Sequence, residues 1–183
     1  MKMIVTLALG LAALPALAAE YAGFSPAKSQ VEFVSTQMNV PVKGRFGRFD
    51  GQIGFDPAKP TDGKARLEVE LASIETGLEE ADAEVAGADW FDVANHPKAV
   101  FESNSVTPLG NQAYRIDGTL TVRGTSQPVS TEARFSEQDG AGVFTGSFVM
   151  KRKDFGVGQG IWGDTSVVAN EVEIRYQLAA PAR

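Results

Sequence analysis

The sequence offers few side chains that could carry out catalysis. His96 is the only histidine and there is no cysteine, which excludes thiol nucleophiles, disulfides and two-histidine metal sites. His96 precedes Pro97, where extended backbone is favoured, and we interpret it as a structural histidine. Neighbouring carboxylates such as Glu79 and Glu80 fall on a polar face, where solvated charge is the ordinary state. We therefore predict no catalytic residue and no metal site.

Two short motifs near the C-terminus share letters with nucleotide-binding signatures. Asp154-Phe155-Gly156 has three letters of a kinase motif, but the sequence lacks the Gly-rich loop and the His-Arg-Asp loop of that chemistry. Gly156, Gly158 and Gly160 lack the strand-to-helix context of a dinucleotide site. We predict a flexible loop at these glycines.

The charge balance narrows the range of partners. The chain has 17 Lys and Arg residues against 23 Asp and Glu residues, a net charge of −6. Nucleic-acid affinity depends on counterion release by basic side chains, and anionic lipid attracts basic segments. Neither a nucleic acid nor an anionic membrane surface is an expected partner.

The first 18 residues have the pattern of an export signal. Lys2 precedes the charge-free apolar run Ile4–Leu14, and Ala16-Leu17-Ala18 has the small residues that signal peptidase recognises. The apolar stretch is shorter than the roughly 20 residues that span a bilayer as a helix. We expect cleavage after Ala18, a single domain over residues 19–183, a periplasmic location and no stable membrane anchor.

The rest of the chain alternates apolar and polar residues with the period of two that is typical of half-buried strands. In the clearest case Tyr114, Ile116 and Leu120 share one face, opposite Arg115 and Asp117. A short helix is predicted over Leu78–Ala88, where apolar residues recur at helical spacing. Eight strands are predicted in the windows Val31–Gln37, Gly51–Phe55, Ala65–Leu71, Ala99–Val106, Ala113–Val122, Val129–Phe135, Val143–Met150 and Val168–Leu178.

The supply of aromatic residues is large for a chain of this size, with 11 Phe, 2 Trp and 3 Tyr. A barrel of about eight strands is just wide enough to be filled by side chains or to hold one small ligand. Because its strands are long, an internal cavity would be a narrow tube suited to an extended hydrocarbon. The pattern alone leaves both a solid core and a ligand tube open.

Motifs spread along the chain resemble those of the YceI family of polyisoprenoid-binding or lipid-binding proteins. They run in family order from about Ser29 to Tyr176. The matching positions are Ser29-x-Val31-x-Phe33, Gly44-x-Phe46, Phe49-x-Gly51-x-Ile53-x-Phe55-Asp56, Ser73-Ile74-x-Thr76-Gly77, Trp90-Phe91-Asp92, Phe101-x-Ser103, Gly118-x-Leu120-Thr121-x-Arg123-Gly124, Pro128-Val129 and Arg152-x-Asp154-Phe155-Gly156.

This resemblance implies an all-β, extended, lipocalin-like, eight-stranded antiparallel β-barrel with one or two short helices. It also implies a polyisoprenoid, isoprenoid quinone or similar long-chain lipid as the ligand, no separate cofactor, and binding rather than catalysis. One departure concerns the helix. Members often have Arg-Asp followed by His-Leu there, whereas this chain has Ala81-Asp82-Ala83-Glu84-Val85, which bears on the choice of head group.

The ligand-binding residues are predicted from their position in the alternation and in the connections. Arg152 and Asp154 are interpreted as an ion pair at a strand end, with head-group contact as the alternative. The predicted wall residues are Phe33, Phe55, Phe101, Ile116, Leu120, Phe135, Phe148 and Ile174. The predicted entrance residues are Phe46, Phe49, Trp90, Phe91, Phe155 and Trp162.

Two other classes of function remain open at this point. The first is an enzyme that acts on a bound lipid or quinone, for which His96, the only histidine, is the candidate acid or base. The second is an interaction module with a solidly packed barrel and no ligand. The sequence also leaves open whether the barrel pairs with a second copy to form a homodimer.

Overall fold

The structure is a computed structural model that describes residues 20–183. The expected export signal, residues 1–18, lies outside the described residues. The strands are β1 Tyr21–Gly23, β2 Gln30–Gln37, β3 Val40–Phe46, β4 Phe49–Phe55, β5 Lys64–Glu70, β6 Ile74–Glu75, β7 Lys98–Gly110, β8 Ala113–Val122, β9 Thr125–Gln138, β10 Ala141–Lys151 and β11 Glu171–Pro181. The helices are α1 Glu79–Ala86 and the 3-10 turns η1 Pro26–Lys28, η2 Pro60–Asp62, η3 Leu71–Ser73, η4 Arg152–Phe155 and η5 Gly160–Gly163.

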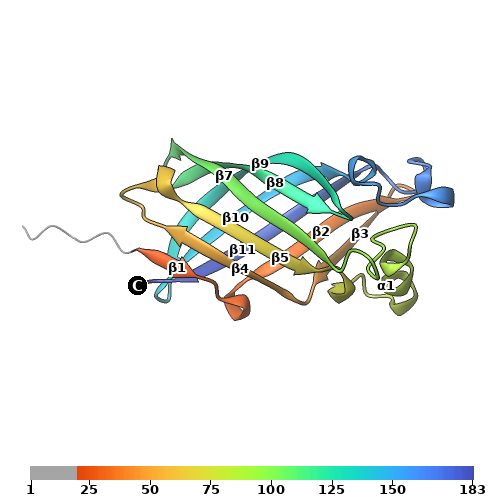
Figure 1. Cartoon of the computed structure of the whole chain (residues 1–183), viewed down its shortest axis with the longest axis horizontal. Helices are drawn as coiled ribbons and strands as arrows, with labels where there is room; N and C mark the ends of the chain where they lie inside the picture. Colours follow the sequence, from red (N-terminus) through yellow and green to blue (C-terminus); the bar gives the residue numbers. More distant parts are fainter. Residues whose placement is uncertain (1–19) are drawn as a thin grey trace, which may run out of the picture.

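The strands form one antiparallel sheet that curls into an elongated barrel (Figure 1). Their order in the sheet is β1-β4-β5-β7-β8-β9-β10-β11-β2-β3-β6. A bridge between Tyr21 and Ala182 joins β1 to the chain beyond β11, so the sheet closes on itself there, and β2, β3 and β6 follow β11 in the strand order. The C-terminus and β1 lie at one end of the barrel, and α1 lies at the opposite end (Figure 1).

Each predicted strand is present in the structure, but the predicted number of strands is too low. The eight predicted windows overlap β2, β4, β5, β7, β8, β9, β10 and β11, but the sheet has eleven strands rather than eight. The additional strands are β1, β3 and β6. β1 and β6 have three and two residues, which is too short to show alternation. β3 contains Pro41 and Gly44, residues that are depleted in strands.

Side chains alternate between the two faces of the sheet as predicted. On β8, Tyr114, Leu120 and Val122 are buried, whereas Arg115 on the other face is exposed. Gly118 continues the inward face, and an added Cβ there would lie 2.5 Å from Cζ of Phe101. The missing side chain at this position leaves room for the Phe101 ring. The predicted helix is also confirmed, because α1 lies within its window.

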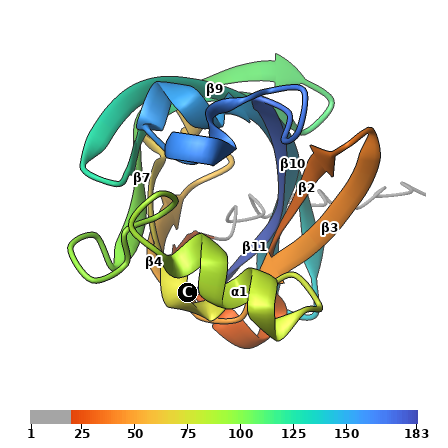
Figure 2. The same ribbon diagram turned by 90° about the vertical axis from the view of Figure 1, so that its right-hand side faces the viewer.

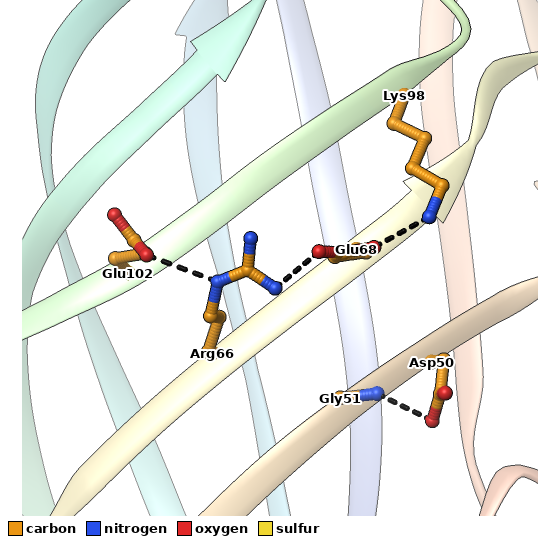
Figure 3. A network of polar contacts seen from close by, with 6 residues as sticks. All are labelled: Asp50, Gly51, Arg66, Glu68, Lys98 and Glu102. Atoms are coloured by element: carbon orange, nitrogen blue, oxygen red, sulfur yellow. Dashed lines mark hydrogen bonds and ion pairs between the residues drawn. The ribbon is translucent and has the colours of Figure 1, made fainter.

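Charged side chains cover the outer face of the barrel, as Figure 3 shows for β4, β5 and β7. Arg66 on β5 bonds Glu102 on β7 through Nε and Oε1 at 3.0 Å, and it also contacts Glu68. Lys98 Nζ lies 2.6 Å from Glu68 Oε2. These side chains are partly exposed to solvent, where ion pairs contribute little stability. They mark the outer face, and the inner face is left apolar.

Candidate binding cavity

The inner face of the barrel encloses an apolar cavity of about 690 Å³. Its wall is formed by inward-facing side chains from most strands of the sheet, together with residues of α1 and η5. The volume falls within the range of about 300–1,000 Å³ that is typical of small-molecule sites. The interior is therefore hollow, which decides between the solid core and the tube that the sequence pattern left open.

A cluster of aromatic rings blocks the cavity at the end near β1 and the C-terminus. Phe55 lies 5.2 Å from Tyr114, 5.2 Å from Phe135 and 5.1 Å from Phe144, measured between ring centroids. Tyr21 packs edge-on against Phe135 at 5.3 Å. We call these five residues the closed-end cluster. Edge-to-face pairs at such distances are favourable packing arrangements, so this end is solidly filled.

The cavity is long and narrow because its lining follows whole strands. On β8 the lining extends from Tyr114 to Val122, eight residue steps, and a strand rises about 3.4 Å per residue. Barrel strands tilt by about 35–45° from the axis, so this stretch spans roughly 20 Å along the barrel. A space of this shape accepts an extended chain more readily than a compact molecule.

The cavity reaches solvent at the α1 end. Leu78, Glu80 and Glu84 line the cavity and are exposed. Across from α1, Trp162 of η5 donates a hydrogen bond from Nε1 to Glu84 Oε1 at 2.7 Å. The Trp162 ring lies 5.6 Å from that of Trp90, and both rings line the cavity. Two indoles and a short acidic helix therefore frame the mouth.

The start of α1 is held by a local hydrogen-bond network. Oδ1 of Asp82 accepts hydrogen bonds from the backbone N–H and from the hydroxyl of Thr76, both at 2.7 Å. Three acidic residues occupy the first helical turn, which is the charge that a helix N-terminus favours. Asp82 is therefore engaged within the protein, and Glu80 and Glu84 are the helix carboxylates that line the mouth.

Arg152 lies beneath the mouth and is 1% exposed. Its guanidinium makes no ion pair within residues 20–183, so the predicted pair with Asp154 is wrong. It lies 5.5 Å from the ring centroid of Trp90. Burial lowers the pKa of the Arg152 guanidinium. Its donors bond five backbone carbonyls at 2.7–3.0 Å, those of Val157, Gly158, Trp162, Val168 and Ala169.

These bonds give Arg152 a clear structural role. Four of the five carbonyls lie at the two ends of the segment that carries η5 and that of Trp162 lies within η5, so one side chain fixes the whole segment against the barrel end. The arrangement leaves no free donor on the guanidinium for a head group. Trp90 Nε1, in contrast, is buried without a hydrogen-bond partner among the described residues.

The cavity lining includes eleven of the fourteen residues predicted from the sequence. They are Phe33, Phe46, Phe55, Trp90, Phe91, Phe101, Ile116, Leu120, Phe148, Trp162 and Ile174. Their side chains come from seven strands and from the connections at the mouth, and the barrel brings them to one surface. Whether each contacts a ligand stays a prediction.

Three predicted residues lie outside the lining. Phe135 is buried in the closed-end cluster behind Phe144. Phe155, the last residue of η4, packs in a separate cluster with Val157. Phe49 packs edge-on against Phe24 at 6.1 Å, and Phe24 takes the lining position.

Sequence reasoning missed four aromatic lining residues, Phe24, Tyr114, Phe144 and Tyr176. Phe144 shares the inward face of β10 with Phe148, so the alternation carried a signal for it. Phe24 lies between β1 and η1, where no periodic pattern exists. His96 lies outside the lining, with its ring against Gly124. Within residues 20–183 there is no cluster of three or more His, Cys, Asp or Glu residues that could hold a metal ion.

The fold and the cavity define a β-barrel with an internal apolar site, and comparison with known proteins identifies the family. A family model described as a YceI-like domain matches residues 23–180. The chain belongs to this YceI-like family, as its motifs indicated.

Two relatives of known sequence are UPF0312 proteins of bacteria. A UPF0312 protein of Azotobacter vinelandii is 37% identical over 120 residues, covering 62% of this chain and 62% of that protein. The match thus spans about three fifths of that relative's length. A UPF0312 protein of Vibrio cholerae serotype O1 is 31% identical over 139 residues, covering 73% of this chain and 72% of that protein.

Solved structures share the architecture. BcnA of Burkholderia cenocepacia superposes with a TM-score of 0.83 at 40% identity, covering 86% of this chain and 99% of that one. A polyisoprenoid binding domain from Saccharophagus degradans has a TM-score of 0.68 at 18% identity, covering 91% and 99%. At this lower identity the likeness shows the fold alone. The helices within residues 20–183 are all too short or too polar to cross a membrane.

Proposed function

We propose that this protein binds one long-chain amphiphile, such as a polyisoprenoid, an isoprenoid quinone or a fatty-acid-like lipid, and carries or stores it in the periplasm. The observation that carries the proposal is the narrow apolar cavity of about 690 Å³, blocked at one end and reaching solvent at the other. The description of the Saccharophagus neighbour as a polyisoprenoid binding domain supports the same ligand class.

The energetics favour a hydrocarbon tail in this space. Each methylene removed from water contributes about 0.8 kcal/mol. Part of that gain is offset by the rotamer freedom that the tail loses and by the cost of association. The closed-end cluster sets the length of tail that fits, and the polar groups at the mouth, Glu80 and Glu84 among them, face the head group.

Binding is favoured over catalysis by the place of the titratable groups. An enzyme acting on the bound lipid needs an acid or base within hydrogen-bond reach of it. His96 lies outside the cavity lining, and the mouth carboxylates belong to exposed positions on α1. Replacement of His96 by Ala is therefore expected to leave ligand retention intact, whereas loss of turnover of a candidate lipid in that variant would favour the enzyme.

Organic extraction of freshly purified protein, followed by mass spectrometry, tests the proposal. We expect a long-chain lipid at about one molecule per chain, and repeated empty extracts would overturn the proposal. A Leu120→Trp variant places an indole inside the cavity and is expected to lose the lipid. Thr121→Trp, on the other face of the same strand, is the matched control and is expected to retain it.

The periplasmic location rests on the sequence of residues 1–18. N-terminal sequencing of the protein from a periplasmic extract is expected to begin at Ala19. Recovery of the full chain in the cytoplasmic fraction would contradict this part of the proposal and would leave the binding cavity unaffected.

A further inference from the structure

Exposed apolar side chains gather around the mouth of the cavity. Residues 20–183 contain six large apolar side chains that are exposed, and four of them lie on segments at this end. They are Met38, Val40, Leu78 and Ile161, with exposed fractions of 71%, 61%, 66% and 82%. We call these four residues the mouth collar.

Contacts between three segments place the collar around one opening. Met38 lies in the β2–β3 turn, and its backbone N–H donates to the carbonyl of Val167, just beyond η5, at 2.8 Å. η5 is joined to α1 by the bond from Trp162 to Glu84. Figure 2 faces this end and shows the β2–β3 hairpin, the segment that carries η5 and α1 arranged around the barrel axis.

The collar continues the apolar surface of the cavity to the outside. Leu78 belongs both to the collar and to the cavity lining. Gln37, directly before Met38, and Trp162, directly after Ile161, also line the cavity. Exposed apolar patches rimmed by polar residues mark interaction sites with proteins or membranes. A tail that leaves its site through water loses a factor of about four in equilibrium constant for every exposed methylene. Contact between the mouth and an apolar phase removes that penalty.

We propose that the mouth collar docks reversibly on a zwitterionic lipid bilayer, so that the tail passes between bilayer and cavity without crossing water. This inference rests on the proposed function. The acidic first turn of α1, with Glu79, Glu80 and Asp82, stands beside Leu78 and repels an anionic surface. The indoles of Trp90 and Trp162 at the mouth suit the interface between head groups and acyl chains.

The tryptophans provide an intrinsic reporter for the test. The chain has two tryptophans, and both line the mouth. Phosphatidylcholine vesicles with brominated acyl chains quench indole fluorescence at short range, so titration with them is expected to quench the wild-type protein. In the double variant Met38→Ser/Ile161→Ser, whose altered residues lie outside the cavity lining, we expect about hundredfold weaker vesicle binding.

A matched control and a separate loading assay make the result interpretable. Leu109→Ser removes an exposed apolar side chain from the C-terminal end of β7 and is expected to bind vesicles like the wild type. Loading of a long-chain lipid in solution, without vesicles, is expected to be equal in all three proteins. Failure of the wild type to load would contradict the proposed function itself, on a readout that does not involve docking.

Three results would overturn the docking proposal. Equal quenching of wild type and double variant would show that brominated lipid enters the cavity without collar contact. Quenching that requires phosphatidylglycerol would show that anionic lipid is preferred. A wild-type dimer that the double variant abolishes, together with no binding to phosphatidylcholine, would assign the collar to a second copy of the chain.

Discussion

Replacing Phe144 by Ala is expected to change which tail length the cavity prefers. Phe144 lines the cavity, and its ring lies 5.1 Å from Phe55 and 5.1 Å from Phe135. Its removal takes away the ring that stands between the cavity and Phe135, which belongs to the closed-end cluster but lies outside the cavity lining. The cavity then lengthens by up to the 5.1 Å that separates the Phe144 and Phe135 rings.

Phe144→Ala lowers the stability of the empty protein, and a longer bound tail restores part of that stability. Truncating a buried Phe lowers the free energy of unfolding by about 3–5 kcal/mol. In a chain of this size each kcal/mol lowers Tm by about 2–4 °C. A longer tail that fills the new space restores about 0.8 kcal/mol for each additional buried methylene. The empty variant should therefore melt well below the wild type, and longer tails should recover part of the difference.

The assay is competition between fatty acids or polyprenols of graded length for delipidated protein, read by Tm. Phe135→Ala is the matched control, because Phe135 lies in the same cluster on the neighbouring strand but outside the cavity lining. It is expected to lose similar stability with no change in preferred length. Equal length shifts in both variants, or no shift in either, would refute the assignment of Phe144 as the inner end.

Three further predictions concern stability. Arg152→Lys leaves several backbone carbonyls unpaired, because Lys has three donors in place of five. We expect this variant to lower the free energy of unfolding, measured by urea denaturation, by about 3 kcal/mol. An unchanged denaturation midpoint would contradict the structural role of the guanidinium. Burial, with a smaller contribution from a neighbouring carboxylate, raises the pKa of Tyr21 to about 12, so its contribution to stability is present below about pH 10 and is lost as the pH rises through about 12. Burial also raises the pKa of Tyr176, so its contribution to stability is likewise lost as the pH rises into the alkaline range. An alkaline unfolding transition that is unchanged in a Tyr21→Phe variant would argue against this. Hydrogen bonds from Lys98 and, to a smaller extent, from Arg66 lower the pKa of Glu68, so the stability that the Glu68 carboxylate contributes is lost as the pH falls below the ordinary glutamate range. Glu68→Gln is expected to lower the free energy of unfolding slightly at neutral pH, and this difference should vanish at about 1 M salt. A difference that persists at high salt would show that the ion pairs of Glu68 are not screened.

The alternation of side chains made most of the barrel predictable. On β8 every second residue from Tyr114 to Val122 faces inward, and the period of two is a local property that a sequence displays directly. The missing strands have local causes. β1 and β6 are too short for a pattern, and β3 is paired by tertiary contacts with β2 in spite of Pro41 and Gly44.

The cavity was less predictable than the wall. Phe135 and Phe144 face each other across paired strands, and both point inward, yet only Phe144 borders empty space. Which ring fills the barrel end depends on Tyr21, more than a hundred residues away in the sequence. The role of Arg152 was also hidden, because its partners are backbone carbonyls, which carry no sequence signature.

A crystal structure of the protein loaded with an isoprenoid quinone would show whether the barrel holds the isoprenoid tail. We predict continuous electron density for the isoprenoid tail inside the barrel, beginning near Trp90 and Trp162 and ending against Phe144. Density for the quinone on the outer surface, or a barrel whose side chains have closed over the cavity with the quinone excluded, would contradict this prediction.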